Sequence, residues 1–139
     1  MSPTLILDCS ITMSWCFREE QAAANLAVLD TLLDRSALVP AHWFLEVANV
    51  LAVAERKKRI AVAESENFLN RLRCLDIEVD KETPHRAFTD ILPLCRRHGL
   101  TSYDAAYLEL AVRRGLPLAS LDDDLRTAAR KLGVHVLGK

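Results

Sequence analysis

Two aspartates in this sequence directly follow short apolar segments, a position where carboxylates gather in proteins built on parallel sheets. Asp8 follows residues 4–7, which read TLIL, and Asp122 follows residues 116–121, which read LPLASL. If these segments are neighbouring parallel strands, their carboxyl ends lie at the same edge of the sheet. We therefore expect the two carboxylates to lie close together at that edge.

Two further acids stand near the beginnings of predicted helices. Glu46 lies near the start of the clearest helical segment, AHWFLEVANVLAVAERKKR, on the flank of its apolar stripe. Asp104 lies in the first turn of a helix whose N-cap we expect at Thr101 or Ser102. Helices that follow strand ends can begin at the same edge of the sheet. Four acids that are distant in the sequence are therefore predicted to converge.

A convergence of Asp8, Glu46, Asp104 and Asp122 favours a hard divalent cation. Carboxylates within a few ångströms of one another repel and raise one another's pKa values. A divalent cation stabilises the ionised forms, and ligands that are all oxygen favour Mg²⁺ or Mn²⁺ over zinc. A water molecule bound to such an ion has a lowered pKa and can attack phosphorus. The inferred chemistry is phosphodiester hydrolysis.

Each acid also has a purely structural explanation, so only the joint arrangement favours a metal site. Asp8 can cap the turn that follows it, and the helix dipole favours Asp104 by about 0.3–1 kcal/mol. In the run of three aspartates, we expect Asp122 to belong to the site, Asp123 to cap the next helix, and Asp124 to lie at the edge of the site. Asp124 is also the alternative to Asp122 as the fourth acid.

Short apolar segments alternate with helical segments along the chain, which predicts a parallel sheet covered on both faces. Strands are expected at residues 4–7, 37–39, 77–79, 116–121 and 134–137. Helices are expected at residues 10–15, 19–35, 41–59, 62–75, 83–98, 102–114 and 123–132. Gly99 and Gly115 are placed as C-caps, and Pro93 is expected to kink or break its helix. The predicted fold is a three-layer α/β/α domain over residues 1–139, with four to five short strands.

Composition leaves several classes open and disfavours others. With 18 basic and 19 acidic residues, the charge balance argues neither for nor against nucleic acid. Basic clusters fall mostly at predicted helix C-termini, where the dipole explains them, and a phosphate-binding role for some stays open. Four cysteines without a C-x-x-C pair, no secretory signal and no membrane-length apolar run favour a reduced, cytoplasmic protein. The sequence has no zinc-type histidine spacing, Gly-rich phosphate loop or G-x-S-x-G motif.

Four stretches of the sequence resemble the PIN domain, and more closely the VapC-type toxins of bacterial and archaeal toxin–antitoxin pairs. They read LILDCSITMSWCFREE, VPAHWFLEVANVL, LTSYDAAYLELAVRRGLPLASLDDDL and AARKLGVHVL. Together they cover nearly the whole chain. Each motif is short, but four motifs in the right order are a specific signal.

The resemblance implies a PIN-like fold and a metal-dependent ribonuclease. By resemblance, Asp8 and Asp104 bind Mg²⁺ or Mn²⁺ directly, while Glu46 and Asp122 complete the catalytic set by binding through water or orienting it. Trp15 also fits the family pattern, and we expect it to pack in the core rather than to stack on bases.

The resemblance also implies partners. Such toxins are usually homodimers and are silenced by a small antitoxin, which typically presents an arginine to the acids. We expect helices at residues 22–35 and 42–59 to form the hydrophobic groove for it. The family's substrates are structured RNAs such as tRNA or rRNA, and cleavage is expected in exposed loops.

Two hydroxyl groups are expected near the acids. Ser10 and Ser120 are expected at the same edge of the sheet, where their hydroxyls would bind water or phosphate.

Two other functions stay open. One rival is an aspartate-type phosphatase, which needs a second acid two residues after Asp8, where this chain has Ser10. The other is a non-catalytic module whose acids dock a basic partner.

Overall fold

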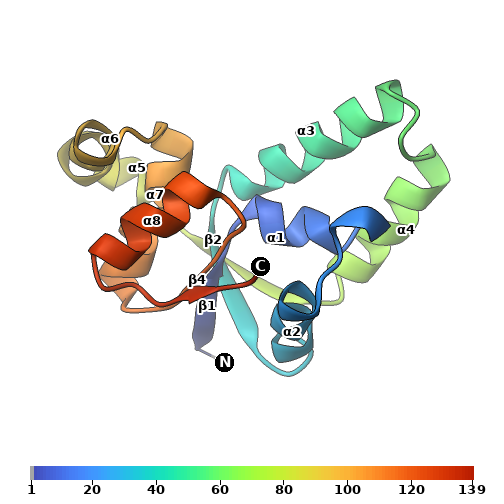
Figure 1. The fold of residues 1–139 in the computed structure, drawn as a ribbon, viewed down its shortest axis with the longest axis horizontal. Helices are drawn as coiled ribbons and strands as arrows, with labels where there is room; N and C mark the ends of the chain where they lie inside the picture. The colour runs from blue at the N-terminus through green and yellow to red at the C-terminus, as the bar shows by residue number, and fades with distance from the viewer. Residues whose placement is uncertain (1) are drawn as a thin grey trace.

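Within residues 2–139, which the computed structural model describes, five parallel strands form one sheet (Figure 1). The strands are β1 (Pro3–Leu7), β2 (Ser36–Pro40), β3 (Asp76–Asp80), β4 (Leu118–Ala119) and β5 (Val136–Leu137). Their order is β3-β2-β1-β4-β5, so the direction of winding reverses between β1 and β4. The predicted parallel sheet is confirmed, and its reversal point is where ligands bind in open α/β sheets.

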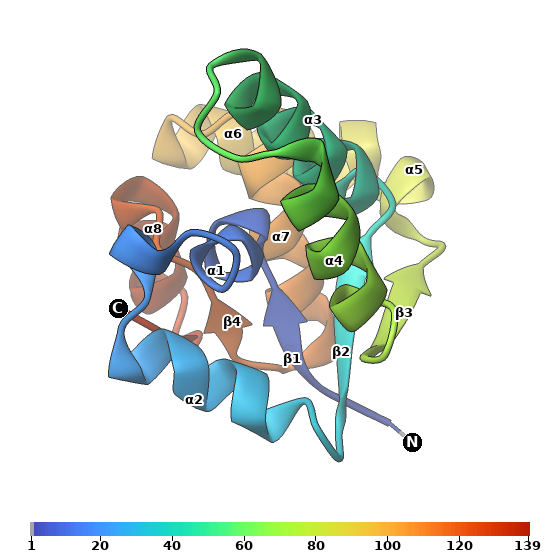
Figure 2. The ribbon, with the colours of Figure 1, turned by 90° about the vertical axis from the view of Figure 1, so that its right-hand side faces the viewer.

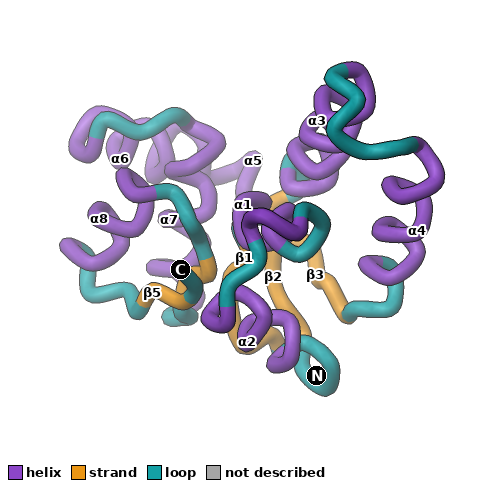
Figure 3. Tube along the Cα trace, turned by 45° about the vertical axis from the view of Figure 1, so that its right-hand side comes forward, coloured by secondary structure: helices purple, strands orange, loops and turns teal. Residues whose placement is uncertain are grey.

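Helices cover both faces of this sheet, which confirms the predicted layers. Figure 2 shows α1, α2 and α4 on one side of the sheet and α7 on the other. The helical segments are α1 (Cys9–Ser14), η1 (Arg18–Glu20), α2 (Ala23–Thr31), α3 (Trp43–Arg56), α4 (Val62–Leu72), α5 (Thr83–Arg86), η2 (Ala87–Ile91), α6 (Leu92–His98), α7 (Ser102–Arg114) and α8 (Asp123–Lys131). Figure 3 shows α3 and α4 as a connected pair at the periphery of the molecule.

Helix α7 lies at the centre of the core. Its residues 105–111 are all buried, and the helix packs against β1 and β2. Burying a leucine such as Leu108 or Leu110 contributes about 1.5–3 kcal/mol, so the position of α7 against the sheet is strongly fixed. The N-cap predicted at Thr101 or Ser102 is Thr101, whose Oγ1 accepts a hydrogen bond from the Asp104 N–H at 3.2 Å. The core thus fixes the first turn of α7, which carries Asp104.

The helix predicted at residues 19–35 was wrong in its extent. Residues 18–20 form a 3₁₀ turn, and Gln21 and Ala22 are extended, so α2 begins at Ala23. The reason is tertiary. Asn25 is buried, and its backbone carbonyl accepts a hydrogen bond from Trp15 Nε1 at 2.8 Å. This contact fixes where α2 starts and shows Trp15 packed in the core.

The helix predicted at residues 83–98 is broken, as Pro93 indicated. Residues 87–91 form a π-helical turn between α5 and α6, and Pro93 lies in the first turn of α6. A proline lacks the N–H that a continuous helix needs at that point. Gly99 and Gly115 have φ of 66° and 63°, the left-handed conformation expected of C-cap glycines.

The strand predicted at residues 116–121 is shorter than expected. Only Leu118–Ala119 pair as β4, and the chain then turns toward α8. The four cysteines are unbonded; Cys9 is buried, Cys16 and Cys95 are half-buried, and Cys74 is exposed. None of the helices described in residues 2–139 has the length and apolarity that crossing a membrane requires.

Candidate active site

Four acids from separate parts of the chain line one pocket of about 360 Å³. Asp8 follows β1, Glu46 lies in the first turn of α3, Asp104 lies in the first turn of α7, and Asp122 precedes α8. The pocket stands at the carboxyl end of the sheet, where β1 and β4 lie side by side at the reversal point. The structure therefore brings the four predicted acids together.

Asp8 is the most buried of these acids, with 4% of its surface exposed. Its Oδ2 accepts hydrogen bonds from Ser10 Oγ and Ser120 Oγ, each at 2.7 Å. Burial raises the pKa of Asp8 above its ordinary value, although the two hydroxyl groups oppose the shift. The carboxylate is thus held in a fixed orientation in a site that disfavours its charge.

The two serines also tie Asp8 to the chain around Asp122. Ser10 Oγ accepts a hydrogen bond from the Leu121 N–H at 2.9 Å, and Ser120 Oγ accepts one from the Asp122 N–H at 3.1 Å. Each hydroxyl has one proton, and both protons are directed at Asp8. Both hydroxyls therefore orient the Asp8 carboxylate, and the expectation that they bind water or phosphate stays a prediction.

In the run of three aspartates, the helix cap differs from the one expected. Asp122 is the N-cap of α8, since its Oδ1 accepts a hydrogen bond from the Leu125 N–H at 2.8 Å. The prediction that Asp123 is the cap was wrong, because Asp123 is exposed and pairs with Lys139. Asp122 both caps α8 and lines the pocket, whereas Asp124 is exposed.

Asp104 carries the clearest electrostatic signature of the site. Burial raises its pKa, and the nearby charges of Asp8, Asp122, Glu46 and Asp124 raise it further, to about 6. Repulsion of this kind is what gathered carboxylates produce in the absence of a compensating cation.

Glu46 lies beside two residues that sequence reasoning did not identify, and one of them, Tyr107, holds it. Tyr107, fully buried on α7, donates its hydroxyl proton to Glu46 Oε1. His42 Nε2 lies 3.8 Å from the same oxygen and 3.0 Å from the Tyr103 carbonyl oxygen. Burial raises the pKa of Glu46, and the Tyr107 hydrogen bond opposes that shift. The only sequence signals for these contacts were the spacings His42–Glu46 and Asp104–Tyr107, each one helical turn.

Glu20 and Arg59 also line the acid pocket, and nothing in the sequence pointed to them. Arg59 donates to Glu20 Oε2 at 2.7 Å and pairs with Glu19. Its guanidinium carbon lies 3.7 Å from the centre of the Phe17 ring. These contacts fix a positive charge at the border of the pocket.

One strand-end acid does not join the site. Asp80 ends β3, but Arg113 donates two hydrogen bonds to it at 3.1 and 2.9 Å and also binds Glu109. Burial tends to raise the pKa of Asp80, but the hydrogen bonds from Arg113 and Thr83 outweigh it and lower the pKa. Asp80 is therefore neutralised within the fold.

The four acids suit a hydrated divalent cation rather than a closed cage. In the part of the chain that the structure describes, no three His, Cys, Asp or Glu side chains are grouped tightly enough to hold a metal ion by themselves. Mg²⁺, however, keeps several waters and usually binds through one or two carboxylates together with substrate phosphates. An open pocket whose carboxylates raise the pKa of Asp104 fits that mode of binding.

Comparisons with known proteins agree with the fold. The model of the PIN domain family matches residues 5–131. Among solved structures, the chain is similar to PAE2754 from Pyrobaculum aerophilum, with 20% identity and a TM-score of 0.69 over 96% of this chain and 83% of that one. It is also similar to FitAcB from Neisseria gonorrhoeae, with 18% identity and a TM-score of 0.64 over 97% of each chain. At these identities the likeness concerns the fold alone. A search of curated proteins found no match.

Proposed function

The chain belongs to the PIN domain family, whose members are generally metal-dependent nucleases, and we propose that it is an endoribonuclease that uses Mg²⁺ or Mn²⁺. The observation that carries this proposal is the convergence of Asp8, Glu46, Asp104 and Asp122 on one pocket. The raised pKa of Asp104, which burial and the other acids produce, indicates that the pocket lacks enough positive charge to offset its acids, since Arg59 at its border is already paired with Glu19 and Glu20. A divalent cation supplies that charge.

We assign the acids separate roles. Asp8 and Asp104 would hold the ion, and Glu46 and Asp122 would contact it through water. When bound, such an ion lowers the pKa of a coordinated water and stabilises charge on the phosphate oxygens. Ser10 and Ser120 fix the Asp8 carboxylate, so it need not reorganise on binding.

Glu46 is the acid best placed to move a proton. Its Oε1 is held by Tyr107, whereas its Oε2 has no hydrogen-bond partner among residues 2–139. Burial raises the pKa of Glu46, which brings it closer to that of a general base working near neutral pH. We assign Glu46 Oε2 to accept the proton of the attacking water.

The aspartate-type phosphatase is disfavoured by the same geometry. Such an enzyme needs an acid two residues after the nucleophile, and Ser10 stands there. Ser10 donates its proton to Asp8 Oδ2, so the position supplies no acid and the hydrogen bond makes Asp8 a weaker nucleophile.

The likeness of the sequence to VapC-type toxins supports a role in a toxin–antitoxin pair, with an antitoxin and a second copy of the chain as partners. The groove for an antitoxin was expected from helices at residues 22–35 and 42–59, and two apolar pockets suggest that α4 contributes to it as well. Apolar pockets pair α4 with each of these helices, one between α3 and α4 and one between α2 and α4. We therefore place an antitoxin helix along α4.

The test is a cleavage assay on purified protein with total RNA, tRNA and rRNA. We expect cleavage with Mg²⁺ or Mn²⁺, none with chelator, and a loss of at least about 100-fold in Asp8→Asn and Asp104→Asn. Asp123→Asn is the matched control, since Asp123 is an exposed acid beside the pocket that does not line it. Equal cleavage by all variants would reveal a contaminating nuclease and favour a non-catalytic module that docks a basic partner.

A further inference from the structure

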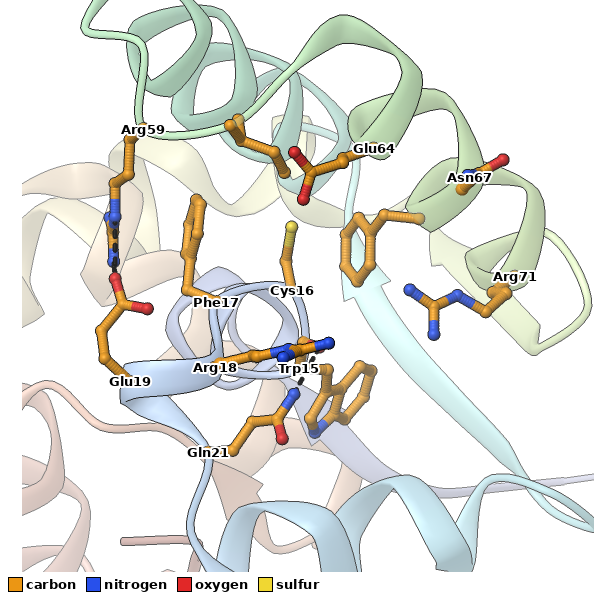
Figure 4. Close-up of a pocket in the computed structure, with 12 residues that line it drawn as sticks. Trp15, Cys16, Phe17, Arg18, Glu19, Gln21, Arg59, Glu64, Asn67 and Arg71 are labelled. Atoms are coloured by element: carbon orange, nitrogen blue, oxygen red, sulfur yellow. Dashed lines mark hydrogen bonds and ion pairs between the residues drawn. The ribbon is translucent and has the colours of Figure 1, made fainter.

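A second pocket, of about 550 Å³, adjoins the acid pocket. Phe17 and Arg59 line both, so the two share a wall. The second pocket lies between the segment that follows α1 and the helix α4, and Figure 4 shows the residues around it. A chain that leaves the acid pocket past Phe17 therefore enters this space.

Two arginines that form no ion pair with the other described residues face this second pocket. Figure 4 shows Arg18, from η1, and Arg71, from α4, directed toward the same space. Neither guanidinium group forms a hydrogen bond or ion pair with any side chain in residues 2–139, whereas Arg59 is bound to Glu19 and Glu20. Both side chains are exposed, so water screens their mutual repulsion, and an anion placed between them would be attracted to both.

The acids in this pocket do not supply that anion. Glu19 is engaged by Arg59, and Glu64 accepts a hydrogen bond from the Ala61 N–H at 3.2 Å, at the start of its own helix. Of the five charged side chains in the pocket, three are arginines and two are glutamates. Because Arg59 is paired with Glu19 and Glu20, Arg18 and Arg71 face the pocket opposite a single further carboxylate, Glu64.

The aromatic side chains of this pocket offer little surface for stacking. Trp15, Phe17 and Phe68 are only 7%, 5% and 4% exposed. The indole N–H of Trp15 is already donated to the Asn25 carbonyl oxygen. A ligand in this space would thus be held through charge and not through stacked or hydrogen-bonded bases.

The acid pocket needs such a neighbour if it is to accept RNA. It is lined by five carboxylic acids and a single cation, Arg59, which is already paired. A bound metal ion offsets the charge around the scissile phosphate, but the flanking phosphates of the strand remain anionic. Most of the affinity for nucleic acid comes from cations that contact such phosphates.

We propose that the pocket between η1 and α4 is a subsite for a backbone phosphate of the same RNA strand, adjacent to the scissile one, with Arg18 and Arg71 as its contacts. This inference rests on the proposed function and adds to it a path for the substrate. It predicts binding that is strong at low salt and insensitive to base sequence.

The experiment measures binding of a fluorescein-labelled single-stranded RNA by anisotropy, in Mg²⁺, from about 50 to 300 mM NaCl. The full chain with Asp8→Asn serves as the non-cleaving background. Adding Arg18→Gln and Arg71→Gln should reduce the slope of log K against log salt by about 1.4, since each phosphate contact on a single strand contributes about 0.7. The matched control, Arg114→Gln with Arg130→Gln, removes two exposed charges at the far ends of α7 and α8 and should leave the slope unchanged.

Two outcomes overturn the inference, and they are distinguishable. If the background protein binds RNA but both double variants give the same slope of log K against log salt, the pocket is not an RNA subsite. A protein partner would then be the better candidate for this pocket. If no variant binds RNA, the proposed function falls as well. In the protein with native Asp8, the double variant Arg18→Gln/Arg71→Gln should have a higher KM for RNA and an unchanged kcat. It should cleave bis(p-nitrophenyl) phosphate at the normal rate, because this small substrate has no flanking phosphate.

Discussion

The hydroxyl of Tyr107 donates a hydrogen bond to Glu46 Oε1, although the two residues are 61 positions apart in the sequence. Tyr107 lies three residues after Asp104 on the same helix, so both side chains fall on one face of α7. One buried helix therefore supplies an acid to the pocket and positions a second acid that comes from α3. We regard Tyr107 as a positioning residue.

Tyr107→Phe should reduce metal-dependent cleavage by about tenfold or more, because a hydrogen bond to a charged group contributes about 1.5–3 kcal/mol. The ring stays in the core, so the variant should still fold, although the lost hydrogen bond should lower the thermal midpoint by several degrees. If Tyr107 acts only through Glu46, the double variant with Glu46→Gln should cleave no more slowly than Glu46→Gln alone. Fully additive effects in this cycle would show that Tyr107 acts independently of Glu46.

The raised pKa of Asp104 gives stability a defined pH dependence. Burial and neighbouring charges raise the pKa of Asp104 in the folded protein from an ordinary 3.8 to about 6. At a pH where the unfolded chain has lost this proton and the folded protein still holds it, ionisation favours the unfolded chain. This cost is absent below about pH 4, grows up to about pH 6 and is constant above it.

Asp104→Asn should therefore raise the thermal midpoint of the metal-free protein at pH 7.5 and leave it nearly unchanged at pH 4. Mg²⁺ should stabilise the native protein at pH 7.5 and the variant much less. Thermal unfolding monitored by circular dichroism, with chelator and with Mg²⁺, measures both effects. A variant that is less stable than the native protein at pH 7.5 without metal would contradict this account of the site.

Arg113 should be important for stability and not for the site. It forms ion pairs with Asp80 and Glu109, whose side chains are only 5% and 7% exposed. Arg113→Met leaves both acids buried without a cation, with only the Thr83 hydroxyl still donating to Asp80, and should lower the free energy of unfolding by about 3–5 kcal/mol. Urea denaturation measures this change, and the exposed neighbour Arg114→Met should stay within about 0.5 kcal/mol. A loss below about 1 kcal/mol for Arg113→Met would show that water satisfies the two acids.

Much of the fold was predictable from the sequence because its signals are local. The alternation of apolar and helical segments identified the parallel sheet, and Gly99 and Gly115 marked helix ends through a conformation that glycine readily adopts. Asp8 and Asp122 could be placed because each follows a strand in that sheet. Tyr107 and Arg59 could not, because their contacts depend on how α3 and α7 pack and on where a loop crosses the pocket.

The errors have the same origin. Asp122 and Asp123 are equally good caps by type, and only the hydrogen bond to Leu125 N–H decides between them. Asp80 ends a strand as Asp8 does, but Arg113 on α7 forms an ion pair with it, so Asp80 does not belong to the acid site. Both distinctions depend on contacts between distant segments, which residue spacing does not encode.

The most direct test of the metal pocket is titration of the protein with Mn²⁺ at pH 7.5, followed by calorimetry or by the electron paramagnetic resonance signal of free Mn²⁺. The account predicts saturable binding that Asp8→Asn and Asp104→Asn each weaken at least tenfold, while Asp80→Asn and Asp123→Asn leave it unchanged. Absence of binding, or equal loss in all four variants, would contradict it.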